Sequence, residues 1–88
     1  MSTMPMPPRE AGEVVVIGLG RSGAAAAALL LDRGYAVYAC DDGASDGVLA
    51  TAAELTARGA TVRTSGHDND RIAKAALVVV SPGVPPDA

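Results

Sequence analysis

Three glycines separate a β-branched run from an alanine-leucine run near the start of the chain, and this arrangement restricts the fold more than any other feature. Residues 14–17 are Val-Val-Val-Ile, which is typical of a strand buried on both faces. Gly18, Gly20 and Gly23 follow with the spacing GxGxxG, and residues 24–31 contain only alanine and leucine, which favours a buried helix. Strand, glycine turn and helix in this order predict backbone amides at a helix start that a diphosphate can approach closely.

The remainder of the chain alternates strand and helix signals. Besides the strand at residues 13–17, strands are expected at residues 36–40, 61–64 and 77–80, the last of them buried. Helices are expected at about residues 24–33, 47–58 and 71–75. Ser22 and Asp46 are the expected caps of the first two helices, and Gly34 and Gly59 are placed to end them.

This alternation predicts an α/β fold, a Rossmann-like parallel sheet of about four strands in the order 3-2-1-4 with flanking helices. Residues 13–88 are expected to form this domain, and the proline-rich residues 1–12 a disordered tail. No helix or fifth strand follows the fourth strand to cover its edge. The domain is therefore expected to be incomplete at its C-terminus.

Composition favours a small globular domain with an aliphatic core. Hydrophobic residues make up 49% of the 88 residues, and Phe and Trp are absent. The net charge of -3 gives no broad positive field, so nucleic acid is not an expected partner. Residues 24–31 are too short to cross a membrane. The single cysteine, Cys40, excludes an internal disulfide and favours a reducing, cytoplasmic location, although an external one stays open.

Polar residues next to the glycine turn and after the second strand are candidate ligand contacts. Ser22 can donate its hydroxyl to a phosphate, and Arg21 either contacts phosphate or faces solvent. Asp41 ends the second strand, where a doubly wound fold places the acceptor for the ribose or base of a nucleotide. Asp42 is its neighbour. The alternative for both aspartates is a solvated loop residue or a helix cap.

The other candidates follow the third and fourth strands. Ser81, Pro82 and Gly83 are expected beside the glycine turn, either as a ligand contact or as an ordinary strand-ending turn. His67 has no evident partner in the sequence and is not expected to take part in chemistry. Cys40 is expected to be a small buried apolar residue, because nothing nearby lowers the pKa of its thiol.

Several of these segments together resemble one known family. Residues 15–23, Asp41, the pair Gly66-His67 and the Val-Ser-Pro-Gly-Val of residues 80–84 resemble the start of the Mur ligases that add D-glutamate to UDP-N-acetylmuramoyl-L-alanine. The resemblance covers residues 14–85. GxGxxG occurs in many families, whereas its combination with Ser-Pro-Gly-Val at the fourth strand is considerably more specific.

The resemblance implies a Rossmann variant that binds the UDP part of the substrate instead of a dinucleotide. It places Arg21 and Ser22 near the diphosphate, and Asp41 and Asp42 at the uracil ring. Asp42 stands where the family is expected to have a small hydroxyl residue. The implied UDP contacts, with Gly83 acting through its backbone, are Gly18, Gly20, Arg21, Ser22, Gly23, Asp41, Asp42, Ser81, Pro82 and Gly83.

The complete enzyme of this family uses ATP and Mg²⁺ to form an acyl phosphate that the amine of D-glutamate attacks. The present sequence has no GxxxxGK[ST] P-loop and no candidate metal cluster. The resemblance therefore implies a chain without catalytic residues or a cofactor of its own. Its expected ligand is UDP-N-acetylmuramoyl-L-alanine or a related UDP-sugar, and the rest of the ligase is missing. The alanine-adding ligase is an alternative parent.

Two other functions use the same glycines and Asp41. In the NAD-binding half of a dehydrogenase, Asp41 would accept from the adenosine ribose hydroxyls. A stand-alone nucleotide-binding module would explain the lack of catalytic residues without truncation, although the bare fourth strand counts against it. A P-loop in downstream coding sequence would favour the ligase, and a dehydrogenase domain there would exclude it.

Overall fold

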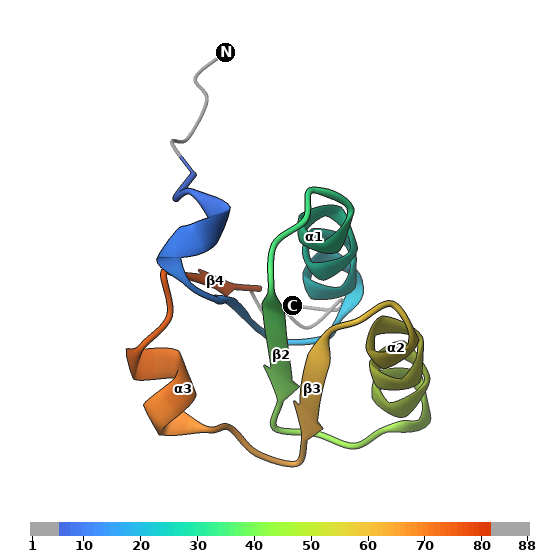
Figure 1. Cartoon of the computed structure of the whole chain (residues 1–88). Coiled ribbons are helices and arrows are strands. Elements are labelled where there is room, and N and C mark those ends of the chain that lie inside the picture. Colours follow the sequence, from blue (N-terminus) through green and yellow to red (C-terminus); the bar gives the residue numbers. More distant parts are fainter. Residues whose placement is uncertain (1–5, 82–88) are drawn as a thin grey trace.

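The computed structural model describes residues 6–81, and a parallel four-stranded sheet forms its centre (Figure 1). The strands lie in the order β3-β2-β1-β4, with every pairing parallel. The predicted α/β class and strand order are therefore confirmed. The strands are β1 (Val14–Ile17), β2 (Val37–Asp41), β3 (Thr61–Thr64) and β4 (Leu77–Val80).

The helices of the described residues are close to their expected positions, but their caps differ. They are the 3-10 helix η1 (Arg9–Ala11) and the α-helices α1 (Arg21–Asp32), α2 (Asp46–Ala57) and α3 (Asn69–Ala73). The prediction of Ser22 as the cap of α1 was wrong: Ser22 lies inside the first turn, and the N-cap is Gly20. Asp46 is likewise the first residue of α2, whose cap is Ser45, with its Oγ accepting from the Val48 N–H at 3.3 Å. Both helices start earlier because glycine and serine are themselves good N-caps.

The two faces of the sheet are covered differently. Helices α1 and α2 pack on one face, the α1–α2 face, where Val16 and Leu55 belong to a core of nine buried residues. The short helix α3 lies over the other face, the α3 face, where three side chains are buried, those of Val15, Tyr38 and Cys40. Alternate residues of β1 and β2 thus supply the two cores, as the period of two in a strand requires.

Two segments are less buried than the sequence indicates. β4 was expected to be buried, but Val80 is 65% exposed and Val78 is 37% exposed. These side chains are exposed because β4 is an edge strand of the described sheet and because only α3 packs on that side of it. The expected buried helix at residues 24–31 is amphipathic. Ala27 and Leu30 are buried against the sheet, whereas Leu29 is 53% exposed.

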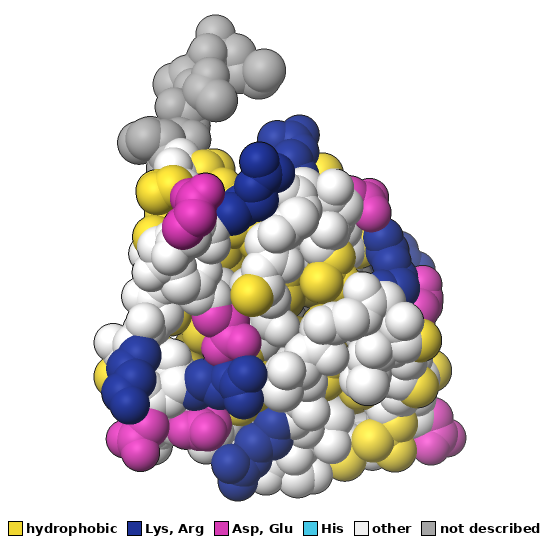
Figure 2. Space-filling view, in the orientation of Figure 1, with side chains coloured by type: hydrophobic (Ala, Val, Ile, Leu, Met, Phe, Trp, Pro, Cys, Tyr) yellow, Lys and Arg dark blue, Asp and Glu magenta, His cyan; other side chains and the backbone are white. Residues whose placement is uncertain are grey.

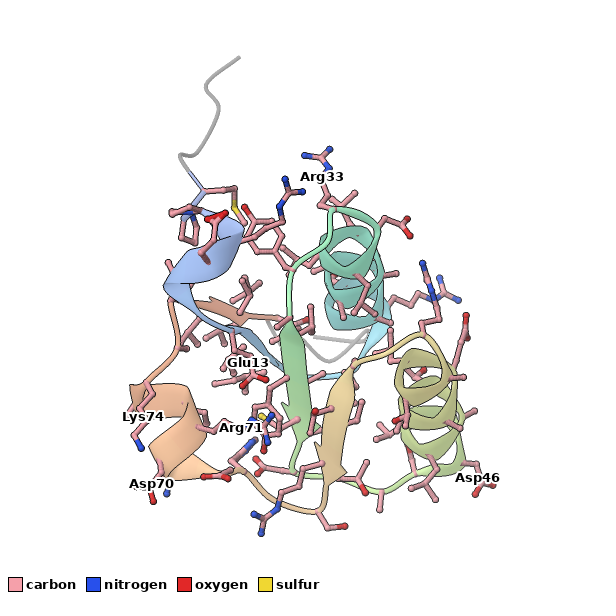
Figure 3. The ribbon with its side chains drawn as sticks, in the orientation of Figure 1. Glu13, Arg33, Asp46, Asp70, Arg71 and Lys74 are labelled. Atoms are coloured by element: carbon pink, nitrogen blue, oxygen red, sulfur yellow. The ribbon has the colours of Figure 1, made fainter. Side chains whose placement is uncertain are left out.

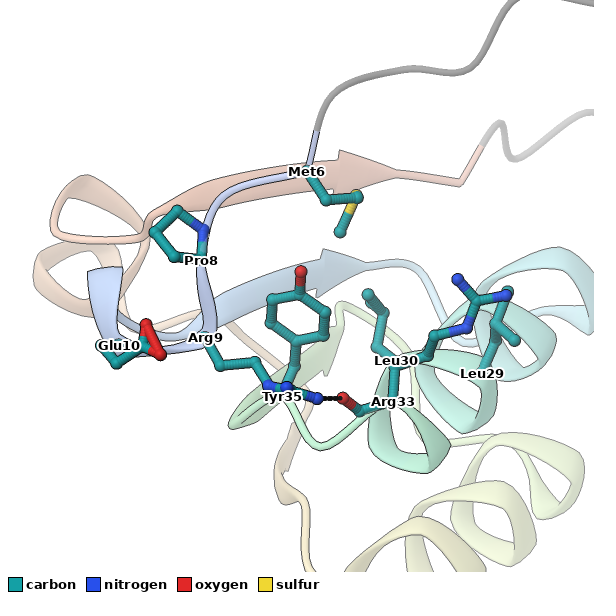
Figure 4. Close-up of a pocket in the computed structure, with 8 residues that line it drawn as sticks. All are labelled: Met6, Pro8, Arg9, Glu10, Leu29, Leu30, Arg33 and Tyr35. Carbon is teal, nitrogen blue, oxygen red and sulfur yellow. Dashed lines mark hydrogen bonds between the residues drawn. The ribbon is translucent and has the colours of Figure 1, made fainter.

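The amino-terminal segment is described from Met6 onward and packs against the end of α1. The Arg9 guanidinium donates from Nη1 to the carbonyl oxygen of Arg33 at 2.7 Å (Figure 4). The Tyr35 hydroxyl donates to the carbonyl oxygen of Pro7, also at 2.7 Å. Whereas the sequence indicates a loose tail through residue 12, residues 6–12 therefore make specific contacts with the domain.

Charged side chains of both signs are interspersed over the face of the molecule that Figure 2 presents. Two ion pairs form among the described residues, Arg58 with Asp32 and Arg71 with Glu13, and the His67 ring contacts the Asp42 carboxylate. Within this part of the chain, no helix is long and apolar enough to cross a membrane.

Candidate functional site

The carboxyl ends of β1, β2 and β4 meet beside the glycine turn. The Gly18 N–H donates to the carbonyl oxygen of Cys40 at 2.8 Å, and the Ser81 N–H donates to the carbonyl oxygen of Ile17 at 2.9 Å. The Leu19 N–H donates to Asp41 Oδ2 at 2.7 Å. The structure thus brings together the glycine turn, Asp41 and Ser81, which are distant in the sequence. Pro82 and Gly83 lie outside the described residues.

The three glycines of the turn differ in their backbone conformation and in the space that a side chain would occupy. Gly18 has a φ of 99°, which favours glycine, and a Cβ there would lie 3.2 Å from the Cβ of Ser81. A Cβ at Gly23 would lie 1.7 Å from the carbonyl oxygen of Gly18, so α1 could not pack against the turn. Gly20 differs from both: its φ is -71°, and a Cβ there would meet no protein atom within 4 Å. The fold therefore requires Gly18 and Gly23, but it leaves the space in front of Gly20 open.

Asp41 is held in place by backbone amides from two segments. Its Oδ2 accepts from the Leu19 N–H in the glycine turn, and its Oδ1 accepts from the Gly43 N–H at 2.7 Å. The sequence did not indicate this bridge between two loops, and the role of Asp41 as a ligand acceptor stays a prediction. Since each carboxylate oxygen has more than one acceptor site, Asp41 can still accept from a ligand.

An open groove lies between the first turns of α1 and α2. Its volume is about 480 Å³, and its lining includes Gly20 and Arg21 from one helix start and Ser45 from the other. Arg21 and Ser22 are exposed in the first turn of α1, which contains no acidic residue. Unpaired helical N–H groups and a guanidinium at this position favour an anion.

Sequence reasoning missed a chain of contacts through His67. Its Nδ1 lies 3.0 Å from Cys40 Sγ, and its Nε2 lies 2.5 Å from Asp42 Oδ1. The expectation that His67 lacks partners was therefore wrong. Cys40 is fully buried, as expected, and burial together with the nearby carboxylates of Asp41 and Asp42 raises the pKa of its thiol. The alternation of side chains in β2 could have indicated that residues 40 and 42 share a face.

Metal-binding side chains are not clustered in the described part of the chain. No group of three or more His, Cys, Asp and Glu side chains there is arranged to hold a metal ion. His67 illustrates the reason, because its two ring nitrogens contact Cys40 and Asp42 separately and the three side chains do not converge on one point.

The family model for the N-terminal domain of MurD-like Mur ligases matches residues 12–88. This match includes the glycine turn, Asp41 and the end of β4. The chain belongs to the MurD-like Mur ligase family. The family resemblance found in the sequence is thus confirmed, and the parallel sheet described above is the fold that this MurD-like domain adopts here.

Curated relatives of this MurD-like chain include three proteins named UDP-N-acetylmuramoylalanine–D-glutamate ligase. The chain is 50% identical to the one from Chlorobium luteolum over 84% of its own length and 15% of the relative's. It is 48% identical to the one from Frankia casuarinae over 85% and 16% of the two lengths. For Nitrosococcus oceani the identity is 37%, over 96% and 18%. The chain therefore spans less than a fifth of the relatives it matches.

Proposed function

We propose that this chain binds the UDP moiety of UDP-N-acetylmuramoyl-L-alanine as the amino-terminal part of a D-glutamate-adding ligase of peptidoglycan synthesis. The space in front of Gly20 is the observation that carries the proposal. Neither the φ angle nor any neighbouring protein atom excludes a side chain there. A diphosphate lying against the Gly20 backbone needs that space, and glycine keeps it free.

The surrounding groups suit a nucleotide diphosphate. The start of α1 presents backbone N–H groups and the positive end of the helix dipole, with the exposed side chains of Arg21 and Ser22 beside it. The Asp41 carboxylate accepts a hydrogen bond from Leu19 of the glycine turn. This bond fixes the carboxylate where it can also accept from the N–H of a base. Uracil offers such a donor at its N3. The proposal therefore puts the phosphates at the helix start and the base at the end of β2.

The ligase reaction also needs ATP and Mg²⁺, and the residues present do not fit either group. The sequence has no GxxxxGK[ST] motif, and the described residues contain no cluster suited to a metal ion. No catalytic step is therefore assigned to this chain. In the proposal its role is to bind and orient the UDP end of the substrate, while the remainder of the ligase, located in the cytoplasm, supplies the ATP-dependent chemistry.

The test is a titration of the chain with UDP-N-acetylmuramoyl-L-alanine and, separately, with NAD, followed through backbone amide shifts. The proposal expects shifts at Gly20, Ser22 and Asp41 with the UDP compound alone. Shifts with NAD alone would instead identify a dinucleotide-binding half of a dehydrogenase. An absence of shifts with the UDP compound would contradict the proposal.

A variant at Gly20 separates binding from folding. Threonine is a good N-cap and adopts the extended conformation of Gly20, so Gly20→Thr is expected to melt like the parent chain. Its side chain fills the space in front of the turn, and affinity for the UDP compound should fall about tenfold or more, which corresponds to about 1.4 kcal/mol. Ala25→Thr, at an exposed position of α1, is the matched control and should bind normally. Equal affinity in the two variants would exclude this turn as the diphosphate site.

A further inference from the structure

Cys40 and Asp41 are the last two residues of β2, Asp42 follows them, and the side chains of these three residues make contacts on different sides of the chain. Asp41 points toward the glycine turn, where its Oδ2 accepts from Leu19. Cys40 and Asp42 point the other way, and His67 contacts both of them, at 3.0 Å and 2.5 Å. His67 therefore bridges the two neighbours of Asp41 from the face opposite to the Asp41 carboxylate.

Backbone hydrogen bonds fix the loop that carries His67. The Gly66 N–H donates to the carbonyl oxygen of Asp41 at 3.2 Å, and the Ser65 N–H donates to that of Gly43 at 3.1 Å. Ser65 has a φ of 60°, a conformation that non-glycine residues seldom adopt. On the far side of His67, the Asp68 N–H donates to the Tyr38 hydroxyl at 3.0 Å. The backbone on both sides of His67 is thus anchored to β2 and the loop after it, which keeps the imidazole close to Cys40 and Asp42.

The chemistry of its partners suits one arrangement of the imidazole protons. Cys40 is buried and its thiol keeps its proton, because burial raises the thiol pKa. The S–H group can then donate to Nδ1, and the other ring nitrogen, Nε2, can donate to the Asp42 carboxylate. Both contacts of the bridge are satisfied by one tautomer.

We propose that His67 is a positioning residue for the nucleotide site, because its bridge between Cys40 and Asp42 holds the end of β2 in the geometry that presents Asp41 to the glycine turn and to the base. Without the bridge, Cys40 and Asp42 each lose a contact on the α3 face, and the Asp41 carboxylate between them gains freedom. His67 acts through Asp41 and need not touch the ligand. The expected effect of His67 on ligand affinity rests on the proposed UDP binding. Its effect on the position of the Asp41 carboxylate can be measured in the chain without ligand.

The free chain gives the first measurement. The Leu19 amide proton reports directly on the hydrogen bond to Asp41 Oδ2, so His67→Ala should shift the Leu19 amide resonance and speed its hydrogen exchange. Glu13→Gln is the matched control, because it weakens another attachment of the α3 face without touching the bridge. It should leave the Leu19 resonance in place. An unshifted Leu19 amide in His67→Ala would overturn the inference.

Two conservative variants of His67 test its two contacts separately and provide a check against misfolding. The amide of Asn lies near the position of Nδ1 and that of Gln near the position of Nε2, so His67→Asn can keep the Cys40 contact and His67→Gln the Asp42 contact. Affinity for UDP-N-acetylmuramoyl-L-alanine should fall about fivefold in His67→Ala, with partial recovery in at least one conservative variant. Equal affinity in the parent chain and all three variants would overturn the inference. No binding by the parent chain would overturn the proposed function, while a Leu19 shift would still support the positioning role.

Discussion

The two faces of the sheet are held by different kinds of contact. On the α1–α2 face, nine buried apolar residues form one core, and an exposed ion pair between Arg58 and Asp32 links the C-terminal ends of the two helices. On the α3 face only three of the residues that the structure describes are fully buried, and polar contacts to Glu13, Tyr38 and Cys40 hold α3 and its preceding loop. The first face depends on buried area, the second on the geometry of a few specific pairs.

This difference separates stability from positioning. A buried aliphatic side chain contributes about 1.5–3 kcal/mol wherever it packs well, whereas a net hydrogen bond contributes about 0.5–1.5 kcal/mol and only in the correct geometry. The α1–α2 face is therefore expected to supply most of the stability of the domain. The α3 face contributes less, but its polar contacts fix particular atoms, including those around Asp41.

The largest expected effect is a truncation on the α1–α2 face. Leu55 is 3% exposed in α2, so Leu55→Ala should lower the free energy of unfolding by about 2–5 kcal/mol, measured by urea denaturation. Leu49 lies on the same helix but is 46% exposed, and Leu49→Ala should change it by about 0.5 kcal/mol or less. Ile72→Ala, on the half-buried side of α3, should fall between the two. A larger loss for Ile72 than for Leu55 would reverse the ranking of the faces.

An intermediate effect is expected for the ion pair that attaches α3 to the start of β1. Arg71 donates from Nε and Nη2 to the two carboxylate oxygens of Glu13 at 2.8 and 2.9 Å, and its guanidinium lies 4.9 Å from the centre of the Tyr38 ring (Figure 3). Because Glu13 is mostly shielded and Arg71 partly exposed, Glu13→Gln should lower the free energy of unfolding by about 1–2 kcal/mol.

Its matched control is the ion pair of the other face. Asp32 is 67% exposed, so Asp32→Asn should cost about 0.5 kcal/mol or less, and added salt should remove that difference. If the two substitutions cost the same in urea denaturation, polar contacts do not matter more on the α3 face, and the contrast between the faces is lost.

The smallest effect is a dependence on pH through Cys40. Burial raises the thiol pKa in the folded chain above its unfolded value, so the folded state favours the protonated thiol. This contribution is complete below the unfolded pKa of about 8.5 and is lost as the pH rises through the folded pKa. The melting temperature of the parent chain should thus fall more steeply above about pH 8.5 than that of Cys40→Ala. Parallel curves would show that Cys40 is not shielded.

Much of the fold follows from local patterns in the sequence. The segments at residues 61–64 and 77–80, each with mostly β-branched residues, give the bounds of β3 and β4 without error, and the GxGxxG spacing places the turn between β1 and α1. These features depend on neighbouring residues alone. The helix caps were harder, because Ser45 and Asp46 are both good caps and only the backbone path decides between them.

The site was predictable only in part, because its remaining features are long-range. The sequence places Asp41 at the end of β2, but not its bond to Leu19, which depends on the register of two strands 22 residues apart. His67 comes from a loop 27 residues beyond Cys40, and no local pattern indicates that this loop turns back over β2. The exposure of Val80 was missed because a β-branched run looks the same at an edge and at the centre of a sheet.

The burial of Cys40 beneath His67 gives the chain an internal reporter. A solution reagent reacts only with a thiolate that it can reach, and this chain has one sulfhydryl, which the native structure covers completely. Cys40 can then be labelled only when the α3 segment detaches from the sheet. The labelling rate therefore measures how often that segment opens while the rest of the domain stays folded. Mass spectrometry of the single added label over time would measure the local opening of the α3 face, with the chain's own cysteine as the probe.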